Sequence, residues 1–311
     1  MSSLSYVLIT PARNEAAFIR LTLKSVTEQT VPPLRWIVVS DGSTDGTDEL
    51  VHNYAEEYSW IKLVRMPERT QRHFAAKISA FNAGVAELAD LSYDLIGSLD
   101  ADTSFDPDYF EFLLNKMAED PKLGLAGTPF KDIATGSYDF RFASTDHVSG
   151  ACQLFRRECY EQIGGYQPVK GGGVDLIAVV TARMRGWKTK TFTEKTYLHH
   201  RTMGSAQTGA LMGWFKNGAK DYALGCHPLW EVFRTAYQMS KKPYFLGGVL
   251  LFSGYLLSAI RRVKRPISDE LMAFRRREQL ARLHNFLFRS RTVESGGIRQ
   301  SSKNNLDALK D

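Results

Sequence analysis

Cysteine is scarce in this chain, and its spacing excludes two common kinds of site. The 311 residues include 3 cysteines, Cys152, Cys159 and Cys226, and no two of them form a Cys-x-x-Cys pair. We therefore expect neither a disulfide framework nor a cysteine zinc site, and a reducing cytosolic setting fits. The first residues also lack a basic segment followed by an apolar run, so no signal peptide is expected.

The chain also lacks an excess of positive charge outside its C-terminal third. The formal net charge is +6, but residues 261–290 hold nine Arg or Lys and three acids, and nine minus three already accounts for the whole excess. The basicity is therefore a local feature of the C-terminal third. Aromatic residues that would stack on bases are not interleaved with these arginines, so nucleic acid is not an expected partner.

The first hundred residues alternate between strand-like and helix-like patterns. Short apolar runs at 6–10, 36–40, 61–64 and 95–99 are typical of strands, and stripes of apolar residues with helical spacing follow the first three. This alternation predicts an α/β fold with a mostly parallel sheet and helices on both faces. Ligands of such sheets bind beyond the carboxyl ends of the strands. No Gly-x-Gly-x-x-Gly follows the first strand, which disfavours a dinucleotide-binding enzyme.

Two carboxylates end the fourth of these strands. Asp100 and Asp102 are spaced i, i+2, so their side chains point to the same side. Unpaired burial of two like charges is costly, and a divalent cation such as Mg²⁺ or Mn²⁺ would resolve the conflict. A solvated turn is the alternative, but a predicted helix with Asp106 as N-cap and Pro107 at its first position favours a functional site.

Several short motifs occur in the order that is typical of one family. The sequence resembles family 2 glycosyltransferases, which have the GT-A fold, a Rossmann-like α/β arrangement. The resemblance covers roughly residues 5–205, and its motifs are Pro11-Ala-Arg-Asn-Glu15, Ser40-Asp-Gly-Ser-Thr-Asp45, Lys77-Ile-Ser-Ala-Phe-Asn-Ala-Gly84, Asp100-Ala-Asp102, Gly150-Ala-Cys-Gln-Leu-Phe-Arg156, Gly164-Gly-Tyr166 and Gly173-Val-Asp175.

The resemblance implies a reaction and assigns roles to residues. The reaction is inverting transfer of a sugar, of the hexosyltransferase type, from a nucleotide-diphosphate sugar to a hydroxyl acceptor, with Mn²⁺ or Mg²⁺ bound. Asp102 is expected as the metal ligand, Asp100 as a ligand of metal or ribose, Asp41 as a partner of the base and Lys77 as a partner of the diphosphate. Asp175 is expected as the catalytic base. Helix capping is the alternative for Asp41 and Asp175, and a solvated helix face for Lys77.

The remaining candidates lie at the first and the last motif. Pro11, Asn14 and Glu15 are expected near the nucleotide, although Asn14 and Glu15 are equally suited to capping the first helix. His199 and His200 are candidate metal or diphosphate ligands, and only one of them can enter the site because neighbours on a strand point to opposite faces. Arg201 would offset the charge of the diphosphate.

The C-terminal third has a different character. We expect a glycosyltransferase domain over residues 1–205, a helical region over 206–290 and a disordered tail over 291–311. Residues 244–260 carry no charge but are too few for a comfortable membrane crossing, so a segment that lies in or dips into the cytoplasmic leaflet is favoured, followed by a basic amphipathic helix. A buried core helix is the alternative. Gly247, Gly254 and Ser258 form a small-residue face suited to helix packing and a homodimer.

These patterns predict an enzyme of cell-surface polysaccharide or lipid-linked glycan assembly, with a glycan or lipid-linked acceptor, at the cytoplasmic face of the cell membrane. Two other functions are considered. A sugar-nucleotide pyrophosphorylase would need a glycine-rich phosphate loop after the first strand, where residues 11–15 stand instead. A catalytically inactive, membrane-associated scaffold is disfavoured because the acidic residues are intact.

Overall fold

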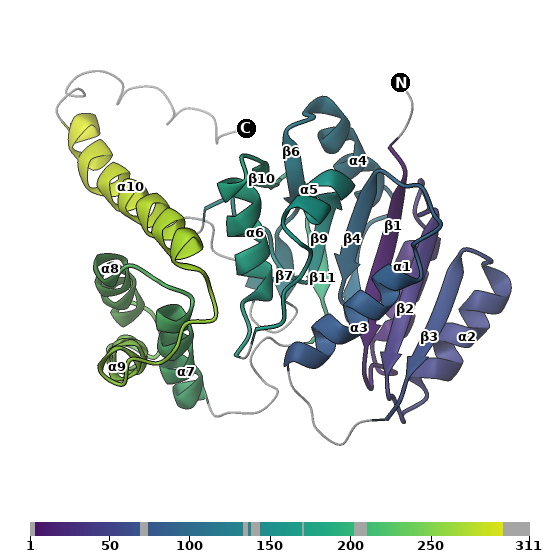
Figure 1. Ribbon diagram of the computed structural model, residues 1–311, viewed down its shortest axis with the longest axis horizontal. Coiled ribbons are helices and arrows are strands. Elements are labelled where there is room, and N and C mark those ends of the chain that lie inside the picture. The colour runs from purple at the N-terminus through teal and green to yellow at the C-terminus, as the bar shows by residue number, and fades with distance from the viewer. Residues whose placement is uncertain are drawn as a thin grey trace, which may run out of the picture.

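The structure, a computed structural model, describes residues 4–68, 74–132, 136–137, 144–169, 171–201 and 210–294. Its main element is a seven-stranded sheet with the order β10-β6-β9-β4-β1-β2-β3 (Figure 1). Every neighbouring pair is parallel except the two that involve β9. The strands are β1 (Tyr6–Ala12), β2 (Arg35–Asp41), β3 (Ile61–Met66), β4 (Leu95–Leu99), β6 (Leu123–Gly127), β9 (Cys152–Arg156) and β10 (Lys188–Thr191).

Helices cover both faces of this sheet because its central strands are apolar on both sides. Along β1, Tyr6 and Leu8 point into one buried cluster, and Val7 and Ile9 into the other. This is the period of two that a strand imposes on its side chains. One face is covered by α1 (Ile19–Thr27), α2 (Thr47–Glu57) and α4 (Tyr109–Glu119), and the other by α3 (Phe74–Ala86), α5 (Arg157–Gln162) and α6 (Val174–Met184). The predicted α/β class with helices on both faces is confirmed.

A second, smaller sheet lies at the carboxyl end of β4. It has the order β5-β11-β7-β8, and its strands are β5 (Thr103–Ser104), β11 (Tyr197–His199), β7 (Phe130–Asp132) and β8 (Gly136–Ser137). In the antiparallel pair of β5 and β11, His199 lies opposite Thr103. Sequence patterns predicted β11 but not its partners, because strands of two or three residues carry no periodic signal.

Two helix starts differ from the sequence predictions. The N-cap of α4 is Asp108 rather than Asp106, because the chain turns once more before the helix begins. The N-cap of α2 is Gly46, at a φ of 91°, and Asp45 instead accepts hydrogen bonds from the backbone of Ala16 and Thr47. The surplus of polar residues at these turns made the position of the cap ambiguous, since several of them can accept such bonds.

The described C-terminal part is helical, as predicted. It consists of α7 (Ala210–Ala223), α8 (Pro228–Met239), α9 (Leu246–Ile260) and α10 (Asp269–Glu294). In Figure 1, α7, α8 and α9 lie together beside the sheet domain, and α10 begins next to α6. No helix among the described residues combines the length and the apolar character that a membrane crossing requires. The predicted tail over 291–311 lies outside the described residues from position 295 onward.

The small-residue face of α9 is used within the chain. A Cβ atom placed on Gly254 would lie 2.0 Å from the carbonyl oxygen of Phe215, and one on Gly218 of α7 would lie 1.8 Å from that of Leu251. The backbones of α7 and α9 therefore touch directly, the packing that glycine permits between helices. The homodimer stays a prediction that this face does not support.

We expect Gly218→Ala to destabilise the protein by about 1–3 kcal/mol, because the added methyl group would have to push two backbones apart. Gly213→Ala on the same helix is the matched control, since a Cβ atom there meets nothing within 4 Å. That change should be neutral or stabilising by up to about 1 kcal/mol, the usual gain from alanine in a helix. Equal midpoints of urea unfolding for the two variants would contradict the close packing of α7 on α9.

The arginines of α10 and of the loop before it largely face the protein. Arg265, Arg275 and Arg276 donate hydrogen bonds to the carbonyl oxygens of Tyr222, Leu224 and Gly225 respectively. These carbonyls end α7, where the helix dipole is negative and cations are favoured. These three arginines are therefore not free to meet a membrane, whereas Arg261, Arg262 and Lys264 are exposed, and the membrane association of the basic helix stays a prediction.

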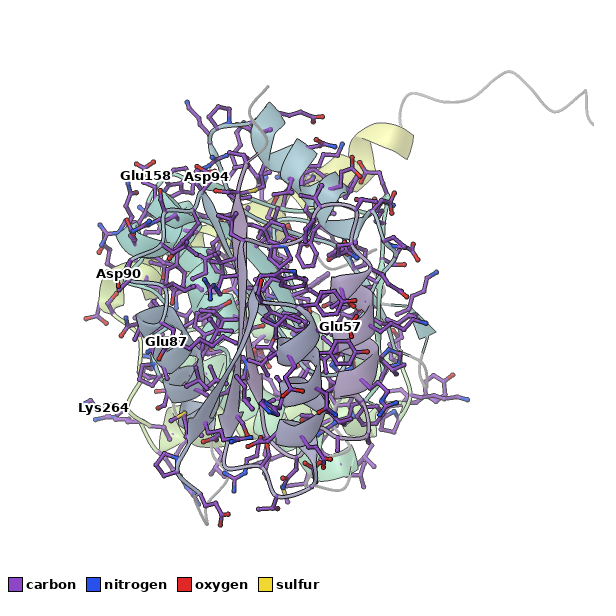
Figure 2. All side chains as sticks on the ribbon, turned by 90° about the vertical axis from the view of Figure 1, so that its right-hand side faces the viewer. Glu57, Glu87, Asp90, Asp94, Glu158 and Lys264 are labelled. Carbon is purple, nitrogen blue, oxygen red and sulfur yellow. The ribbon has the colours of Figure 1, made fainter. Side chains whose placement is uncertain are left out.

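The charged residues that Figure 2 labels all lie on the surface. Each of them is exposed: Glu57, Glu87, Asp90, Asp94, Glu158 and Lys264. Burial of an unpaired charge is costly, so ordinary acids and bases stay in water. Against this background four acids among the described residues are buried, Asp41, Asp102, Asp221 and Glu231, and the first two lie at the carboxyl edge of the large sheet, which makes them candidates for function.

Candidate active site

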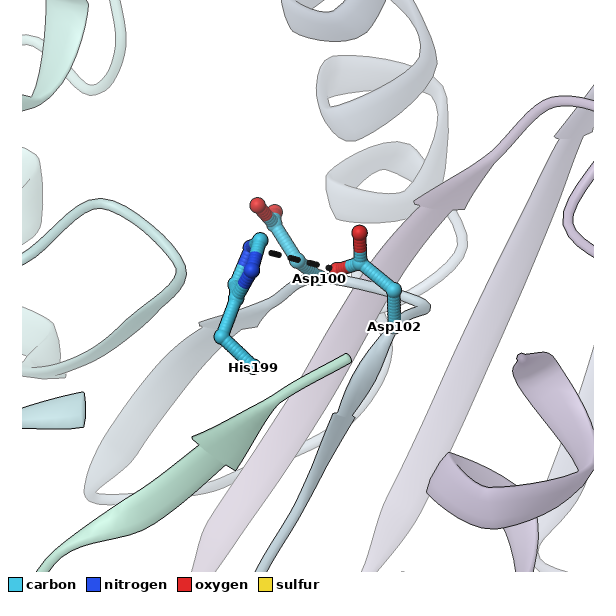
Figure 3. Close-up of side chains that lie close together, drawn as sticks. All are labelled: Asp100, Asp102 and His199. Atoms are coloured by element: carbon cyan, nitrogen blue, oxygen red, sulfur yellow. Dashed lines mark ion pairs between the residues drawn. The ribbon is translucent and has the colours of Figure 1, made fainter. Parts of the chain in front are cut away.

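Two distant segments form an acidic cluster at the carboxyl end of β4. Asp100 and Asp102 follow β4, and the backbone N–H of His200 donates to the carbonyl oxygen of Asp102 at 2.8 Å. Together with the pairing of β5 and β11, this bond brings His199 to the acids. One ligand atom from each of Asp100, Asp102 and His199 lies within 4.8 Å of the others (Figure 3). The three residues point towards a common space, as ligands of one ion would.

The electrostatics of this cluster are unfavourable without a cation. Burial and the charge of Asp100 raise the pKa of Asp102, although His199, Arg201 and Lys77 act in the opposite direction. A raised pKa means that the ionised form of Asp102 is destabilised where it lies. A bound divalent cation would reverse this cost, because it attracts both carboxylates.

Hydrogen bonds decide which of the two histidines faces the acids. Nδ1 of His199 lies 2.5 Å from the carbonyl oxygen of Arg201, and its Nε2 lies 3.6 Å from Oδ1 of Asp102. His200 points elsewhere, with its Nε2 2.8 Å from Oγ of Ser104. The backbone bond fixes the orientation of the His199 ring and leaves Nε2 to meet the acids. The structure thus brings His199 into the cluster, and His200 lies outside it.

Two cations flank the cluster. Nζ of Lys77, on α3, lies 2.5 Å from Oδ1 of Asp100. Arg201 forms ion pairs with Glu15 and, through Nε at 3.5 Å, with Oδ2 of Asp102. Lys77, Glu15 and Arg201 therefore lie beside the acids, and two positive charges stand where they can meet an anionic ligand. For Glu15 this neighbourhood differs from the prediction, which placed it near the nucleotide.

Burial by itself would lower the pKa of Lys77, but the opposing effect of nearby acids is larger. The charges of Asp100, Asp175 and Asp102, with the hydrogen bond to Asp100, give Lys77 a raised pKa. Its ammonium group therefore stays charged at neutral pH. The Lys77 side chain is 42% exposed, so the helix face that carries it does meet solvent, but its Nζ binds an acid of the site.

A cavity of about 270 Å³ lies between the acidic cluster and Asp175. Its wall includes Lys77, Asp100 and His199 together with Gly173 and Asp175. Asp175 is in the first turn of α6, but the N-cap is Gly173, at a φ of 92°, and no side chain caps this helix. Capping therefore does not explain Asp175. The first turn of a helix is a favourable place for a negatively charged side chain, and a general base must lie within reach of the proton that it accepts.

A second group of predicted residues lies at the ends of β1 and β2. Asp41 is 5% exposed, and its Oδ2 lies 3.7 Å from Nη1 of Arg13. Sequence patterns gave no role to Arg13, although it stands in the first motif between the two predicted strands and could have been noted as the partner of a buried acid. The pair holds Asp41 at the carboxyl edge of the sheet, where ligands bind.

Asn14 has a structural task that the sequence did not reveal. It has a φ of 54°, its Oδ1 accepts a hydrogen bond from the N–H of Thr44 at 2.9 Å, and its own N–H donates to Oγ of Ser43 at 3.1 Å. Asparagine tolerates this left-handed backbone better than most residues. Asn14 therefore joins the two loops that follow β1 and β2, and it does not cap α1, whose N-cap is Phe18. Pro11 lies within β1, opposite Val39.

Comparison with known proteins agrees with this geometry. Residues 7–141, which include β1 to β4 and the acids Asp100 and Asp102, match the sequence profile described as "Glycosyl transferase family 2". The match shows that this stretch, less than half of the chain, is similar to that family. The sequence resemblance is thereby confirmed for the part of the chain that holds the predicted nucleotide and metal residues, while Asp175, His199 and Arg201 lie beyond the matched range.

Curated relatives point to the same family. The chain is 28% identical over 203 residues to "Probable glycosyltransferase YdaM" of Bacillus subtilis (strain 168), which covers 61% of this chain and 44% of the relative. It is 32% identical over 117 residues to "Poly-beta-1,6-N-acetyl-D-glucosamine synthase" of Staphylococcus aureus (strain COL), with 37% of this chain and 26% of the relative covered. The chain thus spans less than half the length of the curated relatives that it matches.

Solved structures show the fold over a longer range. A mannosyltransferase from Pyrobaculum calidifontis, solved in complex with GDP-Man and Mn²⁺, is similar with a TM-score of 0.56 and 19% identity, over 95% of this chain and 84% of that one. TarS 1-349 of S. aureus in complex with UDP-GlcNAc gives a TM-score of 0.57 and 14% identity, over 88% and 78%. At such low identity the likeness shows the α/β fold of these glycosyltransferases.

Proposed function

We propose that this chain is an inverting, metal-dependent glycosyltransferase of the hexosyltransferase type, which moves a sugar from a nucleotide-diphosphate donor to a hydroxyl acceptor. The observation that carries the proposal is the cavity of about 270 Å³, which is lined both by a candidate base, Asp175, and by Lys77, Asp100 and His199. A direct displacement at an anomeric carbon needs a base for the acceptor and positive charge for the leaving diphosphate at one shared space.

The residues of the cluster fit a divalent cation. Asp100 and Asp102 offer carboxylate oxygens, and His199 offers an imidazole nitrogen. Mn²⁺ accepts both kinds of donor, whereas Mg²⁺ prefers the oxygens. Burial first, and the charge of Asp100 second, raise the pKa of Asp102, so its ionised form is disfavoured where it lies. A bound ion would supply charge to the departing diphosphate.

The chain's own side chains would perform the remaining tasks. Lys77 and Arg201 provide positive charge for the phosphates, and Asp41 accepts a hydrogen bond from a base N–H at the far end of the edge. Asp175 would accept the proton of the acceptor hydroxyl as that oxygen attacks. The Glu15–Arg201 ion pair holds the guanidinium beside Asp102, so that it faces the donor.

The relatives suggest a role in cell-surface polysaccharide or lipid-linked glycan assembly. One similar protein is a poly-beta-1,6-N-acetyl-D-glucosamine synthase, and two similar structures were solved with GDP-Man or UDP-GlcNAc. We expect a thermal-shift panel of UDP-, GDP- and dTDP-sugars to show stabilisation by donors with one base, and only when Mn²⁺ is present. Stabilisation followed by no transfer or hydrolysis would support an inactive scaffold. Formation of nucleotide sugar from a sugar phosphate would support a pyrophosphorylase.

The outer face of α9 suggests attachment to the cytoplasmic side of a membrane. Leu246, Val249, Leu256 and Ile260 are 46%, 48%, 45% and 69% exposed, and their spacing places them on one side of the helix, opposite the side that packs on α7. The exposed bases Arg261, Arg262 and Lys264 follow directly. An apolar strip beside exposed cations matches the surface of an anionic bilayer.

We expect the double variant Val249→Glu, Leu256→Glu to lose most of its binding to vesicles that contain anionic phospholipid. The reason is that both charges would enter the apolar strip, while the face that packs on α7 stays intact. Sedimentation with vesicles of pure phosphatidylcholine and of phosphatidylcholine with phosphatidylglycerol measures the effect. Leu34→Glu is the control, since Leu34 is equally exposed, at 46%, but lies before β2. Wild-type protein that ignores both kinds of vesicle would sink the proposal.

A further inference from the structure

The loop of residues 144–150, which leads into β9, contacts α6 at both of its ends. One end meets the proposed base: a Cβ atom placed on Gly150 would lie 2.8 Å from Cβ, 3.1 Å from Cγ and 3.2 Å from Oδ2 of Asp175. The backbone of the loop therefore lies directly against the carboxyl group. Only glycine leaves this space free, so any outward or inward shift of the loop changes the room available to Asp175.

The other end of the loop is held by an arginine two turns further along the same helix. Nη1 of Arg183 donates to the carbonyl oxygen of Asp146 at 2.8 Å and to Oγ1 of Thr189 at 3.1 Å. Thr189 donates to the same carbonyl oxygen at 2.5 Å. Arg183 is thus bound to the loop through backbone, which fixes where the chain runs rather than where one side chain points.

The remaining donors of Arg183 meet an acid of the C-terminal helix. Nε and Nη2 lie 2.7 Å and 2.8 Å from the two carboxylate oxygens of Glu278, on α10. The side chains are only 14% and 22% exposed, and two parallel bonds give this pair a defined geometry that a single surface contact lacks. Arg282 adds a contact from α10 to Oδ2 of Asp146 at 3.3 Å.

Strand β10 holds the middle of the loop. The N–H of Thr191 donates to the carbonyl oxygen of Thr145 at 2.6 Å, and its Oγ1 donates to that of His147 at 2.5 Å. His147 itself has a buried Nδ1 without a hydrogen-bond partner among the described residues. A buried polar atom without a partner is costly. The hydrogen bonds from Thr191 must therefore be strong enough to hold the loop in this position despite that cost.

We propose that Arg183 and Glu278 are positioning residues that hold the 144–150 loop, and through Gly150 the carboxyl group of Asp175, in the place that transfer requires. The proposal rests on the proposed function, in which Asp175 is the base. It makes α10, a helix outside the sheet domain, a working part of the active site. Arg183 and Glu278 line an open groove of about 640 Å³ between α6, β10 and α10, and neither lines the cavity that holds Asp175.

The first test replaces Glu278 by Gln, which keeps the shape and removes the charge that holds the arginine. We expect kcat for transfer to fall about tenfold or more, because a small displacement of a catalytic group is expensive. The KM for the donor, Mn²⁺ affinity and the thermal midpoint should stay near the wild-type values. Glu270→Gln is the matched control, an exposed acid in the first turn of the same helix, and it should change none of these quantities.

The second test asks whether the two residues act as one unit. Arg183→Lys keeps the positive charge but loses the fork that reaches Glu278 and Asp146 together, so its kcat should match that of Glu278→Gln. The double variant should be no slower than either single variant, because each single change already removes the interaction between Arg183 and Glu278. A loss in the double variant equal to the product of the single losses would overturn the proposal, as would an unchanged kcat in both single variants.

A third variant separates this idea from the assignment of the base. Gly150→Ala places a methyl group against Asp175 without touching Arg183, and should lower kcat at unchanged donor affinity. If Asp175→Asn transfers sugar normally, the proposed base is wrong, and Arg183 and Glu278 have no catalytic group to position. If Asp175→Asn is slow and Glu278→Gln and Arg183→Lys are not, the base stands and the positioning role fails. The isosteric Glu278 variant keeps the test valid should the Gly150 variant not fold.

Discussion

Asp175→Asn is expected to slow sugar transfer by about 10²–10⁴-fold, the usual contribution of a general base. The acceptor hydroxyl must lose its proton as its oxygen attacks, and an amide cannot accept it. Donor and metal binding should persist, because Asp175 is not among the clustered ligand residues Asp100, Asp102 and His199, and Lys77 and Arg201 keep their positive charges. Single-turnover rates with saturating donor and Mn²⁺ measure the effect on the chemical step.

The stability of this variant is a sensitive control. The N-cap of α6 is Gly173 and receives no side-chain bond, so asparagine at position 175 removes no cap. The loss of one negative charge near a helix N-terminus costs about 0.3–1 kcal/mol. Glu158→Gln, in the first turn of α5 and on the surface, should show a similar small cost without any loss of rate. Transfer by Asp175→Asn within a few-fold of wild type would send the search for the base elsewhere.

Asp102→Asn is expected to abolish metal-dependent donor binding. The variant keeps the shape of the side chain but removes one of two carboxylates from the cluster with His199. Loss of a residue that merely orients a ligand typically weakens metal binding about 10–100-fold, and loss of a ligand should cost at least as much. Calorimetric titration of Mn²⁺, with and without the stabilising nucleotide sugar, gives both affinities.

The fold should tolerate this change, since it removes a buried charge whose ionised form is disfavoured where it lies. The thermal midpoint without metal should therefore be equal to or above that of wild type. Asp106→Asn is the matched control, because Asp106 stands four residues on, is exposed and is outside the cluster. Mn²⁺ and donor binding by Asp102→Asn at wild-type affinity would show that the metal assignment is wrong.

The sheet domain could be predicted from the sequence because its signals are local. β4 is an apolar run of five buried residues, and the acids that follow it had to emerge at the carboxyl edge of a parallel sheet. Lys77, Asp100, Asp102, His199 and Arg201 were named from motifs, and the structure brings them together. The choice between His199 and His200 needed the hydrogen bond to Ser104, which joins positions 96 residues apart and leaves no trace in the local pattern.

The C-terminal third was predicted less well because charge alone does not say which way a side chain points. The arginines before and within α10 suggested a membrane surface, but Arg265, Arg275 and Arg276 bind the end of α7. Gly254 suggested contact between two copies, but its neighbour is α7 of the same chain. In both cases the sequence correctly indicated a residue that makes a contact, but only the fold shows that the contact is with α7 of the same chain.

The pairing of β5 with β11 determines how much of the chain must be synthesised before the proposed metal site is complete. Asp102 and His199 are 97 positions apart, 199 minus 102, and the backbone bond from His200 to Asp102 joins the same two segments. When about 150 residues have been synthesised, the nascent chain contains Asp100 and Asp102 but not His199. It therefore lacks one of the three proposed metal ligands. Domains emerge N-terminal part first, and here the last strand of the sheet domain completes the site.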